Sequence, residues 1–289
     1  MTPPAQAMAS HEYGRLDVWK RPTVDPTQAR ELAERLELRA QSADEVAVRA
    51  AYLALLGLGP GMQVLDIGCG TGAVSRDVAR RVAPDGLVVG LDPSPAFLAI
   101  ARELAERDGL AALIRLREGD ARGLPFGEAE FDVVVAATAL SHVPDGARAV
   151  PEMARVVRPG GRVGIFDLDT ESLIVAHPDR ALTRRVVAAH SDHAVTDGWL
   201  ARRLPGLFAE AGLRDIGVRA FTPLERDPNG FYAGVAERAA QIAVETGSIT
   251  EDERGRWLDA LHAEAAAGRF LAGRTHLFVW GVRPRDPRR

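Results

Sequence analysis

The chain has 289 residues, of which 46% are hydrophobic and 26% charged, and its net charge is −4. Nearly all of the positive charge is arginine, since Lys20 is the only lysine, and the slight negative excess gives no basic field that would favour nucleic acid. One cysteine excludes an intrachain disulfide, and neither a signal peptide nor an apolar run of transmembrane length is present, so we expect a cytoplasmic protein without a membrane partner.

The N-terminal region, residues 1–56, is predicted to be an arm followed by helices. Its first 26 residues are polar and rich in proline, with Tyr13 and Trp19 as isolated aromatics, which favours a lid or a packed arm. Helices are predicted over 27–39 and 43–56. The second begins with the capping box Ser42-x-x-Glu45.

A glycine-rich segment follows, in which Val-Leu-Asp-Ile-Gly-Cys-Gly-Thr-Gly occupies 64–72. Its apolar start is typical of a buried parallel strand, and its glycines allow backbone to approach a ligand closely. Asp66 is costly to bury unless it accepts hydrogen bonds from the loop, a solvent molecule or a ligand amine. The spacing is G-x-G-x-G, with Ala73 where a dinucleotide-binding loop has its third glycine. A nucleoside-like ligand other than NAD is indicated.

The next elements have the order of a nucleotide-binding half. Val74, Val78 and Val82 recur every four residues, which predicts a helix, and 87–91 reads as a second strand. Asp92 ends that strand, about 20 positions after the glycine loop. A carboxylate at this distance is placed to accept both hydroxyls of a ribose.

With these motifs the chain resembles the class I S-adenosylmethionine (SAM) dependent methyltransferases, particularly the small-molecule, quinone-biosynthesis-like branch. Three later segments extend the resemblance: 118–126, 131–138 and 157–162. It implies that the loop wraps the methionine portion of SAM. It also implies that Asp120 reaches the adenine amino group and that the Ala121 amide meets a ring nitrogen. The cofactor-binding residues expected on this basis are Asp66, Gly68, Cys69, Gly70, Asp92, Pro93, Ser94, Gly119, Asp120, Ala121 and Thr138.

The resemblance implies an α/β fold, a doubly wound Rossmann-like seven-stranded sheet whose last strand is antiparallel. We expect the core over 57–227 and a helical cap insertion over 228–272. A final strand and tail are expected over 273–289. Within the insertion, Val235, Ala239 and Ile242 have helical spacing, and a capping box Thr250-x-x-Glu253 begins a second helix.

The acceptor pocket is expected at the carboxyl ends of the strands, where ligands bind in open α/β sheets. The arm, the segment 169–198 and the insertion all attach there. In the insertion, Phe231, Tyr232, Trp257 and Phe270 either roof an apolar or aromatic substrate or form a seam against the sheet.

One histidine is the candidate catalytic base. A phenol acceptor must lose its proton, and His142 stands four residues after Thr138 at the end of the fourth predicted strand. The alternative is that His142 packs the loop or contacts the cofactor. A metal site formed by His177, His190 and His193 is not expected, because their spacing matches no compact zinc pattern.

The function predicted is SAM-dependent methyl transfer to O, C or N of a small, apolar or aromatic metabolite, with S-adenosylhomocysteine (SAH) as product. The alternative is a protein of this fold that uses SAM as a scaffold for a non-methylating reaction. Base methylation is disfavoured because Ala137-Thr138-Ala139-Leu140 replaces a D-P-P-Y type motif. Arsenic methylation is disfavoured by the single cysteine. Arg39 and Arg49 are expected at the surface, or else against the SAM carboxylate, and monomer and homodimer both remain open.

Overall fold

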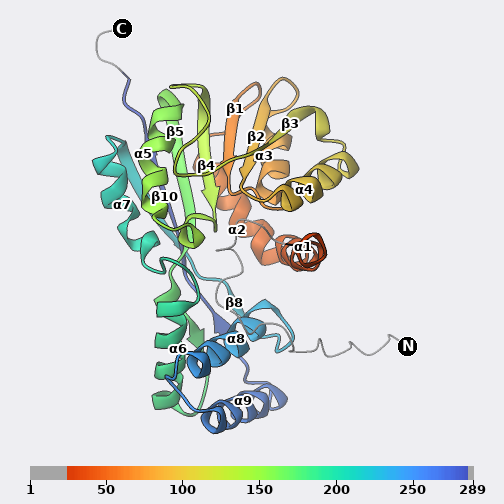
Figure 1. Ribbon diagram of the computed structural model, residues 1–289, viewed down its shortest axis with the longest axis vertical. Helices are drawn as coiled ribbons and strands as arrows, with labels where there is room; N and C mark the ends of the chain where they lie inside the picture. The colour runs from red at the N-terminus through yellow and green to blue at the C-terminus, as the bar shows by residue number, and fades with distance from the viewer. Residues whose placement is uncertain (1–24, 286–289) are drawn as a thin grey trace.

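Seven strands form one mixed sheet in the computed structural model, which describes residues 25–285 (Figure 1). Their order is β3-β2-β1-β4-β5-β10-β7, and β10 is antiparallel to both of its neighbours. The predicted fold class is therefore confirmed. The strands are β1 Gln63–Ile67, β2 Leu87–Asp92, β3 Ile114–Glu118, β4 Phe131–Ala137, β5 Val157–Leu168, β7 Arg214–Phe221 and β10 His276–Val282.

Helices cover both faces of this sheet, as the continuous apolar strands require. Alternate residues of β1 serve the two sides: Val64 packs in the cluster of one face, and Leu65 and Ile67 pack in the cluster of the other. Figure 1 shows the helices beside the strands that they cover. The first face carries α2 Ala43–Ala54, α3 Ala73–Val82 and α4 Pro95–Arg107, and the second carries α5 Ala149–Val156 and α7 Leu200–Glu210.

A helical cap lies beyond the end of the sheet at which β5 finishes (Figure 1). It consists of three helices, α6 Arg180–His193, α8 Phe231–Glu245 and α9 Glu251–Ala266, and a small sheet of order β6-β9-β8. The small strands are β6 Ile174–Val175, β8 Leu224–Glu225 and β9 Ala272–Gly273. Fully buried Trp257 is at the centre of the cap's own hydrophobic core. The segment after β5 thus contributes a helix that the sequence analysis had left unassigned.

Capping explains how two of the helices begin. Thr250 and Glu253 form the reciprocal capping box predicted for α9. The box predicted for α2 is only half formed: the Ser42 hydroxyl accepts from the Glu45 amide at 3.3 Å, but the Glu45 carboxylate pairs with Arg39 at 2.7 Å. An ion pair with the preceding helix, α1 Pro26–Ala40, has replaced the second hydrogen bond.

The predicted turn over 157–162 belongs to β5 in the structure. Phe131 of β4 pairs with Val157, but Val133 already pairs with Arg162, so the intervening residues form a bulge. Gly160 takes a φ of +82° there. Strand pairing with β4 then resumes at Arg162.

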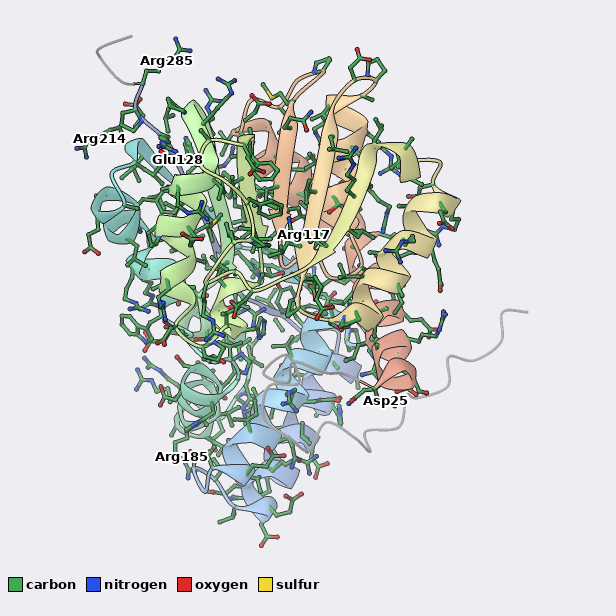
Figure 2. All side chains as sticks on the ribbon, turned by 45° about the horizontal axis from the view of Figure 1, so that its top comes forward. Asp25, Arg117, Glu128, Arg185, Arg214 and Arg285 are labelled. Carbon is green, nitrogen blue, oxygen red and sulfur yellow. The ribbon has the colours of Figure 1, made fainter. Side chains whose placement is uncertain are left out.

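Charged side chains are spread over the whole surface. Figure 2 shows Arg185 at the cap and Arg214 and Arg285 at the opposite end of the molecule. Between residues 25 and 285, no helix is both long enough and apolar enough to cross a membrane. The predicted arm with Tyr13 and Trp19 lies outside the described residues.

Candidate cofactor and acceptor site

The first half of the glycine loop is pressed between two strand ends. The amides of Gly68 and Cys69 both donate to the carbonyl oxygen of Leu91, at 2.7 and 3.0 Å. At Gly68 φ is +67°, and an added Cβ would lie only 2.4 Å from the Cβ of Ala139, just after β4. Glycine is therefore required here both by backbone conformation and by space.

The second half of the loop is open. Gly70 has a φ of +53°, and a Cβ added to it would meet no described atom within 4 Å. Its amide donates to Asp92 Oδ2 at 2.9 Å. Gly70 thus faces space that a ligand can fill, while Asp92 fixes its backbone.

Asp92 joins the end of β2 to the loop. Its Oδ1 accepts from the Ser94 amide at 2.9 Å, so each carboxylate oxygen already holds one backbone N–H. Burial raises the pKa of this carboxyl, and the Ser94 and Gly70 amides oppose that shift. Each oxygen keeps a further lone pair that can accept a ribose hydroxyl.

We expect Asp92→Asn to weaken SAH binding by about 2 kcal/mol, the scale of lost hydrogen bonds to a charged group. The amide nitrogen of asparagine cannot accept from Gly70 or Ser94. Isothermal titration with SAH measures the change, and Asp259→Asn on the exposed side of α9 is the matched control. Unchanged affinity in Asp92→Asn would contradict the assignment of the ribose.

Asp66 is buried on the α3 side of β1. Its Oδ2 accepts from the Ser75 hydroxyl at 2.6 Å, and no ion pair reaches it among the described residues. Burial raises the pKa of Asp66 to about 7, and the nearby charge of Asp92 adds to the rise, although the Ser75 hydrogen bond opposes it. The carboxyl group of Asp66 is therefore hydrogen-bonded by a hydroxyl of α3 and not by the glycine loop.

Because of Asp66, the free energy of unfolding should decrease as the pH rises from about 4 to about 7. Because its folded pKa of about 7 lies above the usual value near 4, folding favours the protonated form, and that stabilisation is lost as the pH rises through this window. Asp66→Asn stays neutral. Its melting temperature should therefore exceed that of wild type at pH 8 but not at pH 5, and a difference independent of pH would contradict the shift.

The residues expected around the adenine and ribose lie on neighbouring loops. Asp120 is exposed and forms an ion pair with Arg122 at 2.6 Å, which holds the pKa of its carboxyl below the usual range. Ala121 is buried beside it, and the Gly119 amide donates to the Asp92 carbonyl oxygen at 3.2 Å. Thus Gly119 is tied to β2, whereas Asp120 must exchange Arg122 contacts for any adenine contact.

The remaining expected cofactor residues have clear structural positions. Pro93 is exposed, and the buried Ser94 caps α4 by accepting from the Phe97 amide at 3.4 Å. Burial raises the pKa of the Cys69 thiol well above its usual value, so it stays protonated. Thr138 has a φ of +49°, rare for a threonine, and its amide donates to the Phe166 carbonyl at 2.6 Å.

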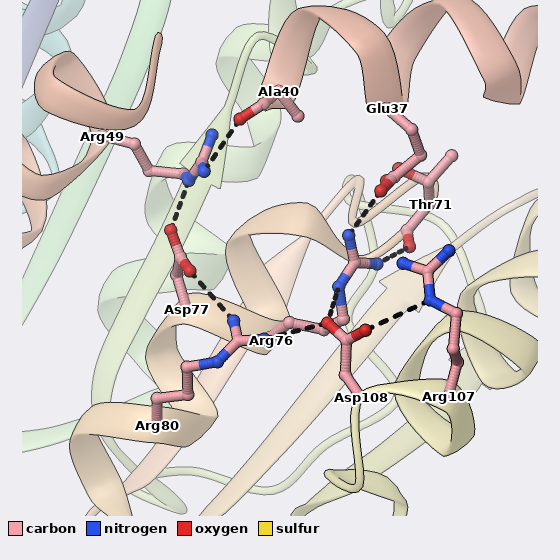
Figure 3. Close-up of polar contacts among 9 residues, drawn as sticks. All are labelled: Glu37, Ala40, Arg49, Thr71, Arg76, Asp77, Arg80, Arg107 and Asp108. Atoms are coloured by element: carbon pink, nitrogen blue, oxygen red, sulfur yellow. Dashed lines mark hydrogen bonds and ion pairs between the residues drawn. The ribbon is translucent and has the colours of Figure 1, made fainter. Parts of the chain in front are cut away.

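Arg76 ties the glycine loop to the first helix (Figure 3). It donates to the Thr71 carbonyl at 2.8 Å, pairs with Glu37 of α1 at 2.6 Å and pairs with Asp108 at 3.2 Å. Its side chain is only 8% exposed. No feature of the sequence distinguished this arginine from the many others.

The arginines expected at the surface are both held by partners. Arg49 pairs with Asp77 of α3 at 2.5 Å and donates to the Ala40 carbonyl at 3.0 Å (Figure 3). Arg39 pairs with Glu45 and lies 4.6 Å over the Phe231 ring. Surface solvation was therefore the wrong expectation, because both guanidinium groups join the first two helices to neighbouring elements.

His142 lies half-buried at the end of the short 3-10 helix Leu140–His142, directly after β4. The fully buried Asp167 accepts from the Ser141 hydroxyl at 2.7 Å and from its amide at 3.0 Å. Burial raises the pKa of Asp167, and the nearby His142 lowers it. The candidate base thus stands beside a buried carboxylate.

The three other histidines singled out from the sequence are not gathered. His177 stacks on Trp257 at 4.9 Å, His193 is exposed and His190 is buried in α6. Within 25–285, no group of three or more His, Cys, Asp or Glu side chains has a geometry suited to a metal ion. A groove of about 610 Å³ beside α6 is lined in part by His177 and lies away from the glycine loop.

The cap aromatics divide between two environments. Trp257 and Phe270 belong to the core of the cap, so they form neither a roof nor a seam. Phe231 is 39% exposed. Tyr232 is buried and its hydroxyl has no hydrogen-bond partner in the described part of the chain. Sequence reasoning missed Arg274 and His276, which are buried nearby and carried no motif.

The loop and its surroundings fit SAM. The open space at Gly70 admits a ligand backbone, Asp92 offers acceptors for two hydroxyls, and the cap closes the edge of the sheet that bears Thr138. The donors and acceptors of this arrangement suit a nucleoside attached to an amino acid.

Known proteins resemble this chain in sequence and in fold. Residues 64–161 match a family described as a methyltransferase domain. The chain is 32% identical to an uncharacterized 37.1 kDa protein in transposon TN4556 of Streptomyces fradiae, over 78% of this chain and 64% of that protein. It thus spans less than two thirds of that relative. It is 31% identical to the demethylmenaquinone methyltransferase of Bacillus cytotoxicus, over 60% of this chain and 79% of the relative.

The fold recurs in the crystal structure of the YcgJ protein from Bacillus subtilis. The two structures agree with a TM-score of 0.57 over 82% of this chain and 98% of that one. Their sequences are 19% identical, so this likeness concerns the fold alone.

Proposed function

This chain belongs to the class I SAM-dependent methyltransferases, and we propose that it transfers the methyl group of SAM to a small apolar or aromatic metabolite. The observation that carries the proposal is the cradle made by the Gly70 backbone and Asp92. It opens at the edge of the sheet that the cap covers. A ligand held there has its reactive end between the strand ends and the cap.

Each proposed cofactor residue has a defined task. Asp92 accepts the ribose hydroxyls, Asp120 and Ala121 meet the adenine, and the loop from Gly68 to Gly70 follows the amino-acid portion. Thr138 lies beneath the position of methyl transfer. SAM, when bound, supplies a methyl group on a sulfonium, which needs no further activation as a leaving group.

The chain's own contribution is alignment and exclusion of water, because an in-line displacement depends mainly on geometry. The cap and the positive-φ turn at Thr138 enclose the strand ends. An acceptor atom that is O, C or N is compatible with this arrangement. For a phenol or hydroxyl acceptor, His142 takes the proton, and the buried Asp167 stabilises the charged imidazole.

Titration with SAH against NAD tests the cofactor half of the proposal. We expect SAH to bind and NAD to show no heat. Absence of SAH binding to the folded protein would refute the proposal.

Incubation with methyl-labelled SAM and an extract of the native metabolites tests the transfer. Label in a small product supports methyl transfer. Tight SAH binding with no labelled product would instead favour the scaffold use of SAM.

A further inference from the structure

Arg274 and three other buried polar side chains, each near enough to be affected by its charge, lie where the cap joins the sheet. They come from four different segments. Each has at least one buried side-chain nitrogen or oxygen atom that forms no hydrogen bond in the described part of the chain. The four are His190 of α6, Tyr232 of α8, Arg274 between β9 and β10, and His276 of β10. Their exposed fractions are 4%, 4%, 6% and 1%. Buried polar groups almost always have partners, so four orphans at one place require an explanation.

The cluster lies at the edge of the sheet that bears the strand ends. His276 is opposite Leu168, the last residue of β5, and its ring stacks on Phe166 with centroids 5.0 Å apart. Gly273, next to Arg274, pairs with Ile174 and Leu224 of the small sheet. Arg274 therefore lies between the two sheets, next to β10, which two strands separate from the cofactor strand β1, and beside the end of β5.

The four side chains also share an electrostatic environment centred on Arg274. Burial lowers the pKa of His190 to about 3, and the charge of Arg274 lowers it too. Burial and the charge of Arg274 also lower the pKa of His276. Burial raises the pKa of Tyr232, which Arg274 opposes. At neutral pH both imidazoles are uncharged, the phenol is protonated, and Arg274 is the cation among them.

No carboxylate forms an ion pair with Arg274 among residues 25–285, and its Nε atom has no hydrogen-bond partner there. Asp167 lies near enough for its charge to raise the pKa of Arg274, but its oxygens accept hydrogen bonds from Ser141 and the Leu168 amide. Glu45 lies near too and is paired with Arg39. An unpaired buried charge is among the most costly features that a protein can retain. An anionic ligand can supply the missing ion pair.

We propose that Arg274 and Tyr232 form an acceptor subsite for the carboxylate of a monoanionic substrate, which rests on the proposed function and specifies its substrate class. A single guanidinium matches a single negative charge, and the Tyr232 hydroxyl provides a second donor. The neutral His190 and His276 rings offer a donor each without adding charge.

Binding of simple probes to the SAH-loaded full chain tests the subsite. Benzoate should bind at least 10-fold more tightly than its neutral isostere benzamide, and more tightly than inorganic phosphate. Arg274→Met should abolish this preference and Tyr232→Phe should reduce it several-fold. Arg256→Met, on the exposed side of α9, is the matched control and should keep it. Equal affinities for benzoate and benzamide in wild type, or no benzoate binding at millimolar concentration, would overturn the inference.

Thermal melting without ligand separates a binding role from a structural one. If Arg274 awaits a ligand, Arg274→Met removes an unpaired charge and should raise the melting temperature by a few degrees. A lowered melting temperature restored by Arg274→Lys would assign a structural role and overturn the inference. SAH binding separates failure of this subsite from failure of the proposed function. If wild type binds SAH but does not prefer benzoate to benzamide, only the subsite is refuted. If wild type does not bind SAH, the proposed function is refuted.

Discussion

Gly70→Ala is expected to reduce SAH affinity by about 100-fold or more while the protein still folds. The added Cβ meets no described atom within 4 Å, so the fold can accept it. That same open space is where the loop approaches the proposed cofactor. The substitution also strains a backbone with a φ of +53°, which costs about 1–2 kcal/mol.

Gly109→Ala isolates the backbone strain. Gly109 follows α4 with a φ of +71°, and a Cβ added there also meets nothing within 4 Å. The two variants should lose similar thermal stability, but only Gly70→Ala should lose SAH binding, as measured by isothermal titration. Equal affinities in the two variants would show that the ligand does not pass Gly70.

Arg76→Met should destabilise the protein by about 3 kcal/mol, because it leaves the mostly buried Glu37 without its ion-pair partner and removes the buried one of the arginines that pair with Asp108. Urea unfolding measures this change. SAH binding should weaken as well, since the Thr71 carbonyl in the glycine loop loses its donor. Arg76 thus adds a polar link between α1 and the loop to the apolar contacts that α1 makes with α4 (Figure 3).

Arg80→Met is the matched control for this variant. Arg80 is on the same helix and also pairs with Asp108, at 2.9 Å, but its side chain is 50% exposed. Exposed ion pairs contribute about 0–1 kcal/mol, so this variant should unfold almost as wild type does. Similar losses of unfolding free energy in the two variants would show that the burial of Arg76 does not increase the contribution of its contacts to stability.

The cofactor half could be predicted because its determinants are local. Glycines at positive φ, a carboxylate ending β2 and a stripe of valines on α3 are all visible within short windows of sequence. The capping box of α9 was predicted for the same reason. The half-formed box at Ser42 shows the limit, since Arg39 of another helix captured Glu45.

The cap was less predictable because its organisation depends on distant residues. Helix α6 did carry a signal: Asp179 caps it, and Leu182, Val186 and Ala189 have helical spacing. Arg274 carried none. Its proposed role rests on its burial and on the absence of an ion-pair partner among the described residues, and no short window of sequence contains that information.

Within residues 25–285, the chain crosses between sheet and cap after β5, between α6 and α7, after β7 and before β10, and these three strands are neighbours at one side of the sheet. The chain runs from β1 through the glycine loop to α3, and from β2 to α4, so these strands connect only to helices of the core and not to the cap. On the proposed function, donor selection and acceptor selection are therefore encoded in separable halves of one domain. Substitutions within 169–198 and 222–275 can then change the acceptor while the donor half stays unchanged. Relatives that share the donor half therefore need not share a substrate.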